Sequence, residues 1–148
     1  METEKHVNRG VLVGLVFSVI LILIHGIIDF RNGSSQADFV LWLFQFIVYF
    51  IAALMAANSE YQHQKNLDAP SLKEVVNAGR GVAMIIWVLL WVYIIVRSLL
   101  WDDSGMFGEA GVVAFVVLVV LDFVIAIALG SWGGSLIVKQ HTVINGNE

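Results

Sequence analysis

Four polar side chains that could exchange protons or bind an ion interrupt otherwise apolar stretches of this chain. Asp122 lies near the middle of the apolar run Ala110–Leu129, and His25, Gln45 and Arg97 lie in three other apolar runs. A carboxylate in hydrocarbon costs about 2.5–3.5 kcal/mol even on lenient insertion scales, and such residues often mark ion or proton pathways. We therefore consider Asp122 and His25 as a candidate titrating pair for proton or ion handling.

Each of these side chains also has a structural interpretation. Asp122 can be a buried partner that holds the bundle, or a neighbouring subunit, together. Interhelical hydrogen bonds in lipid are the favoured explanation for His25 and Gln45. Arg97, near the end of its apolar run, can extend its guanidinium to the headgroups instead of pairing with Asp122. The residues alone leave both interpretations open and favour the structural one for Asp122.

Four long apolar segments must position these side chains. The chain has 148 residues, of which 59% are hydrophobic and 14% charged, with a mean hydropathy of +0.84. A membrane-spanning helix needs about 20 mostly apolar residues, and residues 10–28, 39–57, 81–101 and 110–138 meet that length. We predict a single transmembrane domain with an all-α fold, an integral membrane four-helix bundle.

The basic residues predict the orientation of this bundle. Of the 8 Lys and Arg residues, all but Arg31 and Arg97 fall on one side, namely Lys5, Arg9, Lys65, Lys73, Arg80 and Lys139. Because positively charged loops stay in the cytoplasm, we expect both termini and the loop of residues 58–80 to be cytoplasmic.

The cytoplasmic loop contains a predicted helix start. Asn58–Ala69 is polar and is predicted to be irregular. Ser71 and Glu74 then have the spacing of a capping box, in which each side chain bonds the other residue's backbone N–H. The third helix should begin near Leu72 and run unbroken to Trp101.

Small residues recur at a spacing of about four in three of the segments. They are Gly10, Gly14 and Ser18 in the first segment, Ala52, Ala53 and Ala56 after Gln45 and Tyr49 in the second, and Ala126, Gly130 and Gly134 after Asp122 in the fourth. Positions four apart share one helix face, and helices in lipid approach most closely through small residues. These faces are predicted to meet, so that Asp122 points into the bundle.

The last segment is longer than a bilayer requires. At 1.5 Å per residue, residues 110–138 would form about 43 Å of helix, against a hydrocarbon core of about 30 Å. We predict a kink or an early helix end at Gly130–Gly134, with helix tilt as the alternative. Trp87 and Trp91 share one face of the third segment. We expect them to pack against a small-residue face, and a lipophilic cofactor contact is the alternative.

Composition and motifs exclude several kinds of site. With 0 cysteines, the chain has no disulfide, thiolate metal site or thiol nucleophile, and its net charge of −4 argues against nucleic-acid binding. The sequence contains no G-x-S-x-G, H-E-x-x-H or P-loop motif. His6, His63 and His141 have no metal-binding spacing, and a bis-histidine haem would need a second copy of His25. We expect no catalysis, metal or cofactor.

In layout the chain resembles small four-span bacterial membrane proteins of unknown function. The shared features are a short first loop, the helix start that feeds the third span, and the glycine-rich end Gly130–Gly134 followed by Lys139. The resemblance implies a location in the bacterial cytoplasmic membrane and carries no activity with it. We expect a non-catalytic accessory or scaffold subunit, with the lipid bilayer and other membrane subunits or a second copy as partners. The alternative is a small oligomeric transporter or proton or ion conductor that uses Asp122 and His25.

Overall fold

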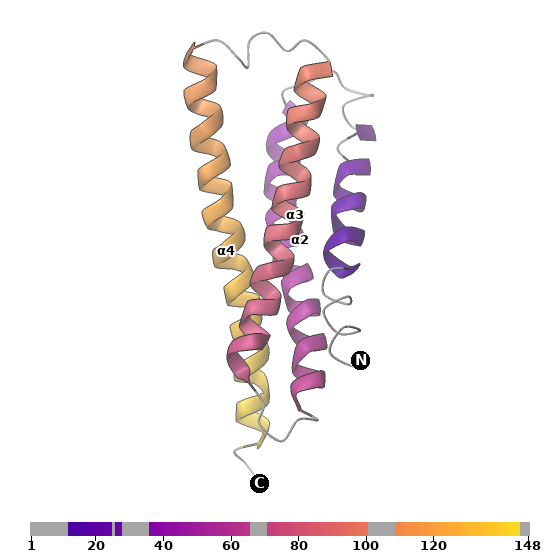
Figure 1. Cartoon of the computed structure of the whole chain (residues 1–148), viewed down its shortest axis with the longest axis vertical. Helices are drawn as coiled ribbons and strands as arrows, with labels where there is room; N and C mark the ends of the chain where they lie inside the picture. Colours follow the sequence, from indigo (N-terminus) through magenta and orange to yellow (C-terminus); the bar gives the residue numbers. More distant parts are fainter. Residues whose placement is uncertain (1–11, 25, 28–35, 66–70, 101–108, 146–148) are drawn as a thin grey trace.

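The described part of the chain is entirely helical. The computed structural model describes residues 12–24, 26–27, 36–65, 71–100 and 109–145, and within them the side chains other than those of 36–42, 97–100, 109–110 and 141–145. An N-terminal helix, Leu12–Ile24, is followed by α2 (Gln36–Gln64), α3 (Leu72–Leu100) and α4 (Glu109–Asn145). Figure 1 shows α2, α3 and α4 running along one another, with the N-terminal helix beside α2 and α3. The predicted all-α fold of four helices is confirmed for these residues.

Three of these helices are long and apolar enough to cross a membrane. The candidate spans are Leu43–Gln64, Leu72–Val96 and Gly111–Gln140. The described N-terminal helix, Leu12–Ile24, is shorter than the roughly 20 residues that a span requires. The ends of the predicted first span, residues 10–11 and 28, lie outside the described residues.

The connection between α2 and α3 is shorter than the sequence predicts, because α2 extends farther than expected. α2 continues to Gln64, so the prediction of irregular structure is wrong for residues 58–64. The reason is that Tyr61 and Gln64 are both buried against the neighbouring helices, which stabilises the polar last turns. α3 begins at Leu72, as the capping motif predicts.

A glutamine replaces part of the predicted capping box. The backbone N–H of Ser71 donates to Oε1 of Gln64 at 2.9 Å and not to the Glu74 carboxylate. Nε2 of Gln64 donates to Glu74 at 2.6 Å and to Glu60 at 2.8 Å. One amide from the end of α2 therefore ties together the last turn of α2 and the first turn of α3.

α4 passes through its glycine-rich segment as one helix that reaches Asn145. The prediction of an early helix end at Gly130–Gly134 is therefore wrong. These glycines serve close packing, because a Cβ on Gly130 would lie 2.8 Å from the Cα of Arg80 and one on Gly134 would lie 2.7 Å from the Cα of Val76. The absence of side chains lets α3 approach the α4 backbone without interrupting its hydrogen bonds.

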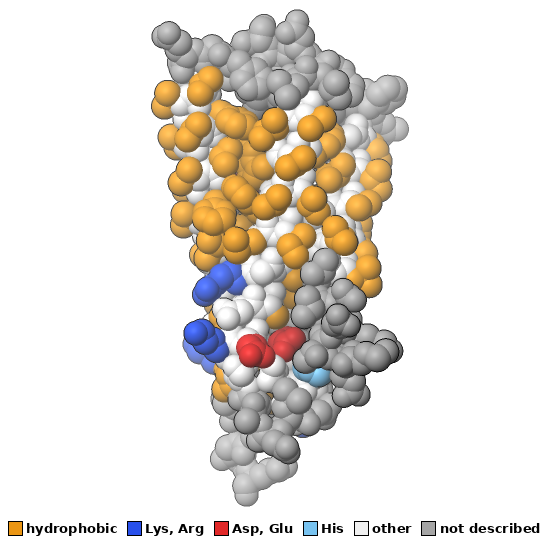
Figure 2. Space-filling model, viewed as in Figure 1, with side chains coloured by type: hydrophobic (Ala, Val, Ile, Leu, Met, Phe, Trp, Pro, Cys, Tyr) orange, Lys and Arg blue, Asp and Glu red, His pale blue; other side chains and the backbone are white. Residues whose placement is uncertain are grey.

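The buried side chains form two cores at different levels of the bundle. The larger core contains Leu21, Val48, Tyr49, Ala52, Ala56, Val82, Ala83, Ile86, Leu90 and Ala126. The smaller core contains Ala57, Tyr61, Val75 and Ile137 and lies toward the end where α2 ends and α3 begins. Figure 2 shows apolar side chains covering the bundle at the level of the larger core, and charged side chains gathered at the other end.

Candidate functional site

Asp122 lies within the larger core and is completely buried. It shares the inward face of α4 with the buried residues Ala126, Gly130 and Gly134. Ser131, which contacts Arg80 at the start of the charged end, lies about 13 Å farther along α4 at 1.5 Å per residue. Asp122 is thus near the middle of the apolar part of the bundle.

Three side chains from two other helices donate hydrogen bonds to the Asp122 carboxyl group. Nε2 of Gln45 donates to Oδ1 at 2.7 Å, and Nε1 of Trp91 donates to Oδ2 at 2.7 Å. The hydroxyl of Tyr49 also donates to Oδ2, at 3.1 Å. Gln45 Nε2, which has two hydrogens, makes a further bond to the Tyr49 hydroxyl at 3.1 Å. We call Gln45, Tyr49, Trp91 and Asp122 the Asp122 network.

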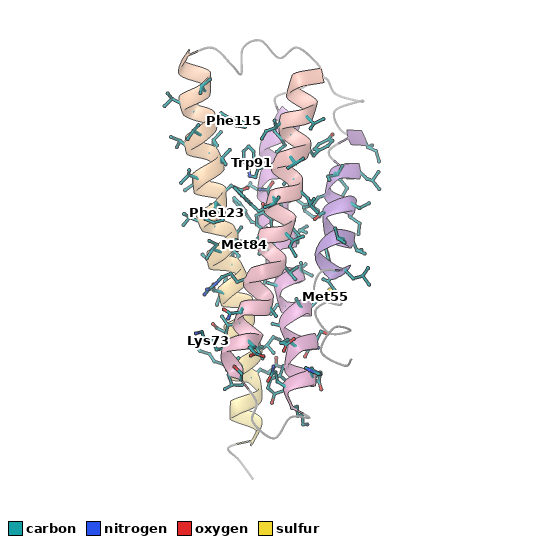
Figure 3. All side chains as sticks on the ribbon, in the orientation of Figure 1. Met55, Lys73, Met84, Trp91, Phe115 and Phe123 are labelled. Carbon is teal, nitrogen blue, oxygen red and sulfur yellow. The ribbon has the colours of Figure 1, made fainter. Side chains whose placement is uncertain are left out.

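Local helix geometry brings these donors to one point. Gln45 and Tyr49 are four residues apart on α2 and therefore share a face. Tyr49 is itself fully buried. On α3, the Trp91 ring contacts Phe115 of α4 edge-on, with centroids 5.4 Å apart. Figure 3 shows Trp91 directed from α3 toward α4, in the same region as Phe115 and Phe123. This aromatic contact holds the indole N–H in place beside the carboxyl group.

The donors of the Asp122 network are all uncharged. Both carboxyl oxygens are already occupied as acceptors, which replaces the hydration that a buried carboxyl group loses. Trp91 Nε1 can only donate, whereas the Tyr49 hydroxyl can donate or accept. In this arrangement the Tyr49 hydroxyl is the partner best able to accept a bond from a proton on Asp122. The network therefore joins three helices, α2, α3 and α4.

The structure brings together some of the polar residues singled out from the sequence. Gln45 contacts Asp122 directly. His25 lies outside the described residues, and Arg97 lies in α3 but its side chain is not described. Trp91 was expected only as a packing residue, and its bond to Asp122 was missed. A signal existed, because most buried indole N–H groups have a hydrogen-bond acceptor and Asp122 is the acidic residue within an apolar run.

A second tryptophan on the same face of α3 differs from Trp91. The Trp87 ring packs on Phe123 with centroids 4.9 Å apart. Its Nε1 atom is buried and has no hydrogen-bond partner among the described residues. Trp87 thus contributes apolar contact area only. Trp91 contributes apolar contact area and also an N–H group that is hydrogen-bonded.

The predicted packing residues lie at helix contacts wherever they are described. A Cβ on Gly14 would lie 3.3 Å from Ile85 of α3. Ser18 is buried and donates its hydroxyl to the Gly14 carbonyl at 2.7 Å. Gly10 lies outside the described residues. Gly79 of α3 was not singled out, yet a Cβ there would lie 2.7 Å from the Gly130 carbonyl oxygen.

Neither a metal cluster nor a known relative guides the assignment further. In the described part of the chain, no three His, Cys, Asp or Glu side chains are grouped so as to hold a metal ion. Comparison of the chain with protein-family models, with curated proteins and with solved structures found no match.

Proposed function

We propose that the chain is a four-span integral membrane protein of the bacterial cytoplasmic membrane, with both termini and its charged end in the cytoplasm. Three helices with the length and apolarity of spans support this placement. Exposed apolar side chains around the bundle support it too, because a soluble protein would not expose a continuous apolar belt of this size (Figure 2). Lys65, Lys73, Arg80 and Lys139 at the charged end favour the cytoplasmic orientation.

Within the membrane, we propose a non-catalytic role as an accessory or scaffold subunit. The observation that carries this proposal is the closed Asp122 network, in which a fully buried acid has both oxygens bonded by side chains of its own chain. An acid arranged in this way fastens α4 to α2 and α3. It leaves the outer surface of the bundle as the part available for interaction.

The surface of α4 favours a partner subunit or a second copy. In an 18-residue apolar window of each span, 11% of the α4 residues are buried, against 39% of the α2 residues and 33% of the α3 residues. Between Gly111 and Leu121 no α4 side chain is buried, and Figure 1 shows α4 separating from α3 toward this end. Lipid covers such a surface in a monomer, and another membrane subunit covers it in a complex.

Purification in a mild detergent tests the proposed role. We expect the tagged chain to elute as a defined assembly, either with a stoichiometric membrane partner or as a homo-oligomer. Mass measurement of the intact complex would distinguish these two forms. A chain that elutes only as a monomer, with no stoichiometric companion, would contradict the accessory role.

The depth of Asp122 favours a second candidate, a small oligomeric proton or ion conductor that uses Asp122 with His25. Proton flux into vesicles that contain the purified protein tests this candidate. Under the accessory role, wild type and Asp122→Asn should both match protein-free vesicles. A flux that appears with wild type and disappears with Asp122→Asn would establish the conductor instead.

A further inference from the structure

We propose that the edge between α3 and α4 at the charged end binds the phosphate of an anionic phospholipid headgroup, with Arg80 as the principal contact. We call this edge the rim site and define it by Lys73, Asn77 and Arg80 of α3 and Ser131 and Lys139 of α4. The inference rests on the proposed membrane placement and not on the accessory role.

Arg80 is held in place by α4. Its Nε donates to Oγ of Ser131 at 3.1 Å, while Ser131 donates its own hydrogen to the Ile127 carbonyl at 2.7 Å. The Cα of Arg80 also lies beside Gly130, where an added Cβ would be only 2.8 Å away. The side chain is nevertheless exposed. The bond at Nε orients the guanidinium, and its four terminal N–H groups make no hydrogen bond to the described residues. A guanidinium held in this way suits bidentate phosphate binding.

Further polar groups extend the rim site away from Arg80. Lys73, Asn77 and Arg80 are all exposed and follow one another at positions i, i+4 and i+7, which share one face of α3. Because α3 and α4 are antiparallel and Arg80 contacts Ser131, Lys139 lies about level with Lys73. Both are roughly 10–12 Å from the Arg80 level at 1.5 Å per residue. Figure 3 shows Lys73 on the outer side of α3, near the start of this helix.

Two described acidic groups of the same region, Glu60 and Glu74, contact Gln64 of α2. Glu74, next to Lys73 in sequence, accepts a bond from Gln64 at 2.6 Å, and Glu60 accepts one from the same amide at 2.8 Å. Both carboxylates are therefore held at the α2–α3 turn. In Figure 2 the Lys and Arg side chains occupy one flank beneath the apolar belt, and the Asp and Glu side chains lie apart from them. Neither of these two carboxylates therefore belongs to the rim site.

The level of the rim site identifies the anion as a lipid headgroup. Arg80 is the last charged residue of α3 before the apolar stretch that begins at Gly81. On α4, Trp132 directly follows Ser131, is 57% exposed and packs on Phe50 with ring centroids 5.0 Å apart. Exposed tryptophans of this kind mark the membrane interface. Basic edges between helices at this level on the cytoplasmic side attract acidic headgroups, and the apolar belt above offers contact to the acyl chains.

Native mass spectrometry of the delipidated protein in non-ionic detergent tests the rim site. The titrants are dioleoyl phosphatidylglycerol, dioleoyl phosphatidylcholine and inorganic phosphate. We expect wild type to bind phosphatidylglycerol more tightly than phosphatidylcholine. Arg80→Gln should weaken phosphatidylglycerol binding about fivefold, as expected for one basic residue near the membrane surface. Lys73→Gln should weaken it by a smaller factor. Ser131→Ala should also weaken it partly, because it frees Nε of Arg80.

Lys65→Gln is the matched control. Lys65 is an exposed lysine that follows the end of α2 and belongs to neither helix of the rim site, so its removal should leave phosphatidylglycerol binding unchanged. Three outcomes would overturn the rim site. They are equal affinity for the two lipids, equal losses in Lys65→Gln and Arg80→Gln, or displacement of phosphatidylglycerol by an equal concentration of inorganic phosphate. If the chain instead appears in the soluble cell fraction, the membrane placement itself fails, and that result is separate from loss of lipid selectivity in an inserted chain.

Discussion

At Asp122, three uncharged donors take the place of the water that a carboxyl group loses in the core. Two of them come from α2 and one from α3, while the acid itself belongs to α4. Each bond therefore crosses between helices. Interhelical hydrogen bonds in membranes contribute about 0.6 kcal/mol on average and up to about 1.7 kcal/mol. The network's contribution to the bundle thus comes from several bonds that share one acceptor.

Removing the shared acceptor should destabilise the bundle more than truncating an exposed apolar neighbour. We expect Asp122→Ala to lower the free energy of unfolding by about 2 kcal/mol or more, because it breaks three bonds and leaves buried donors unpaired. Leu121→Ala is the control, since Leu121 is 46% exposed. Unfolding in detergent, followed by circular dichroism, measures both. Equal stability of the two variants would contradict the proposed fastening role.

The two tryptophans of α3 provide a matched pair for a single hydrogen bond. Trp91→Phe removes the donor to Asp122 and should cost about 0.6–1.7 kcal/mol. Trp87→Phe removes a buried N–H without a described partner, so it should be neutral or slightly stabilising. Both changes keep an aromatic ring against α4. The same unfolding measurement distinguishes them, and a larger loss for Trp87→Phe would argue against the assigned hydrogen bond.

At the scale of elements, glycines set the distance between α3 and α4. Gly79, Gly130 and Gly134 each place backbone where a Cβ would meet the facing helix at 2.7–2.8 Å. This contact lies at the level of Arg80 and Ser131, at the start of the charged end, so it also places Arg80 against Ser131. Both the Asp122 network and the rim site therefore depend on the close approach of α3 and α4.

Adding one methyl group at this contact should separate the helices. We expect Gly134→Ala to destabilise the protein by about 1–3 kcal/mol through overpacking against Val76. Gly81→Ala is the control, because nothing lies within 4 Å of a Cβ there. That substitution should be neutral or stabilising by up to about 1 kcal/mol, since alanine favours helix. If both variants have the same free energy of unfolding, the close contact at Gly134 is not a determinant of stability.

The sequence predicts those features of the helices that depend on residues close together in the chain. It does not predict those that depend on contacts between distant residues. The start of α3 at Leu72 follows from local capping residues, and the inward direction of Asp122 follows from the spacing of Ala126 and Gly130 on one helix face. The extension of α2 to Gln64 could not be read from polarity, because it depends on burial of that side chain between two helices. The early helix end predicted at Gly130–Gly134 was wrong for the same reason, whereas the packing face that contains Gly134 was predicted from its spacing. The effect of Gly134 depends on Val76, a residue far away in the chain.

At the scale of the whole molecule, the bundle is longer than the hydrocarbon core of a bilayer. α2 and α3 each have 29 residues and α4 has 37, which corresponds to about 43 Å and 55 Å of helix against a core of about 30 Å. The excess lies at the charged end, where the core of Ala57, Tyr61, Val75 and Ile137 holds the three helices together. The proposed cytoplasmic part is thus a short continuation of the helices and not a separate loop domain.

The absence of cysteine allows this placement to be tested directly. Because the chain has 0 cysteines, a single introduced cysteine is the only target for a maleimide that cannot cross membranes. We expect Lys65→Cys to react in inside-out vesicles and not in intact spheroplasts, because basic residues at the charged end favour a cytoplasmic location. Val117→Cys, 59% exposed on the apolar belt, should react in neither preparation, because thiolates do not form in hydrocarbon, and should react after denaturation. Labelling of Lys65→Cys in intact spheroplasts would reverse the orientation. Labelling of Val117→Cys without denaturant would place the apolar face of α4 in water and refute the membrane assignment, even though the helices themselves would be unchanged.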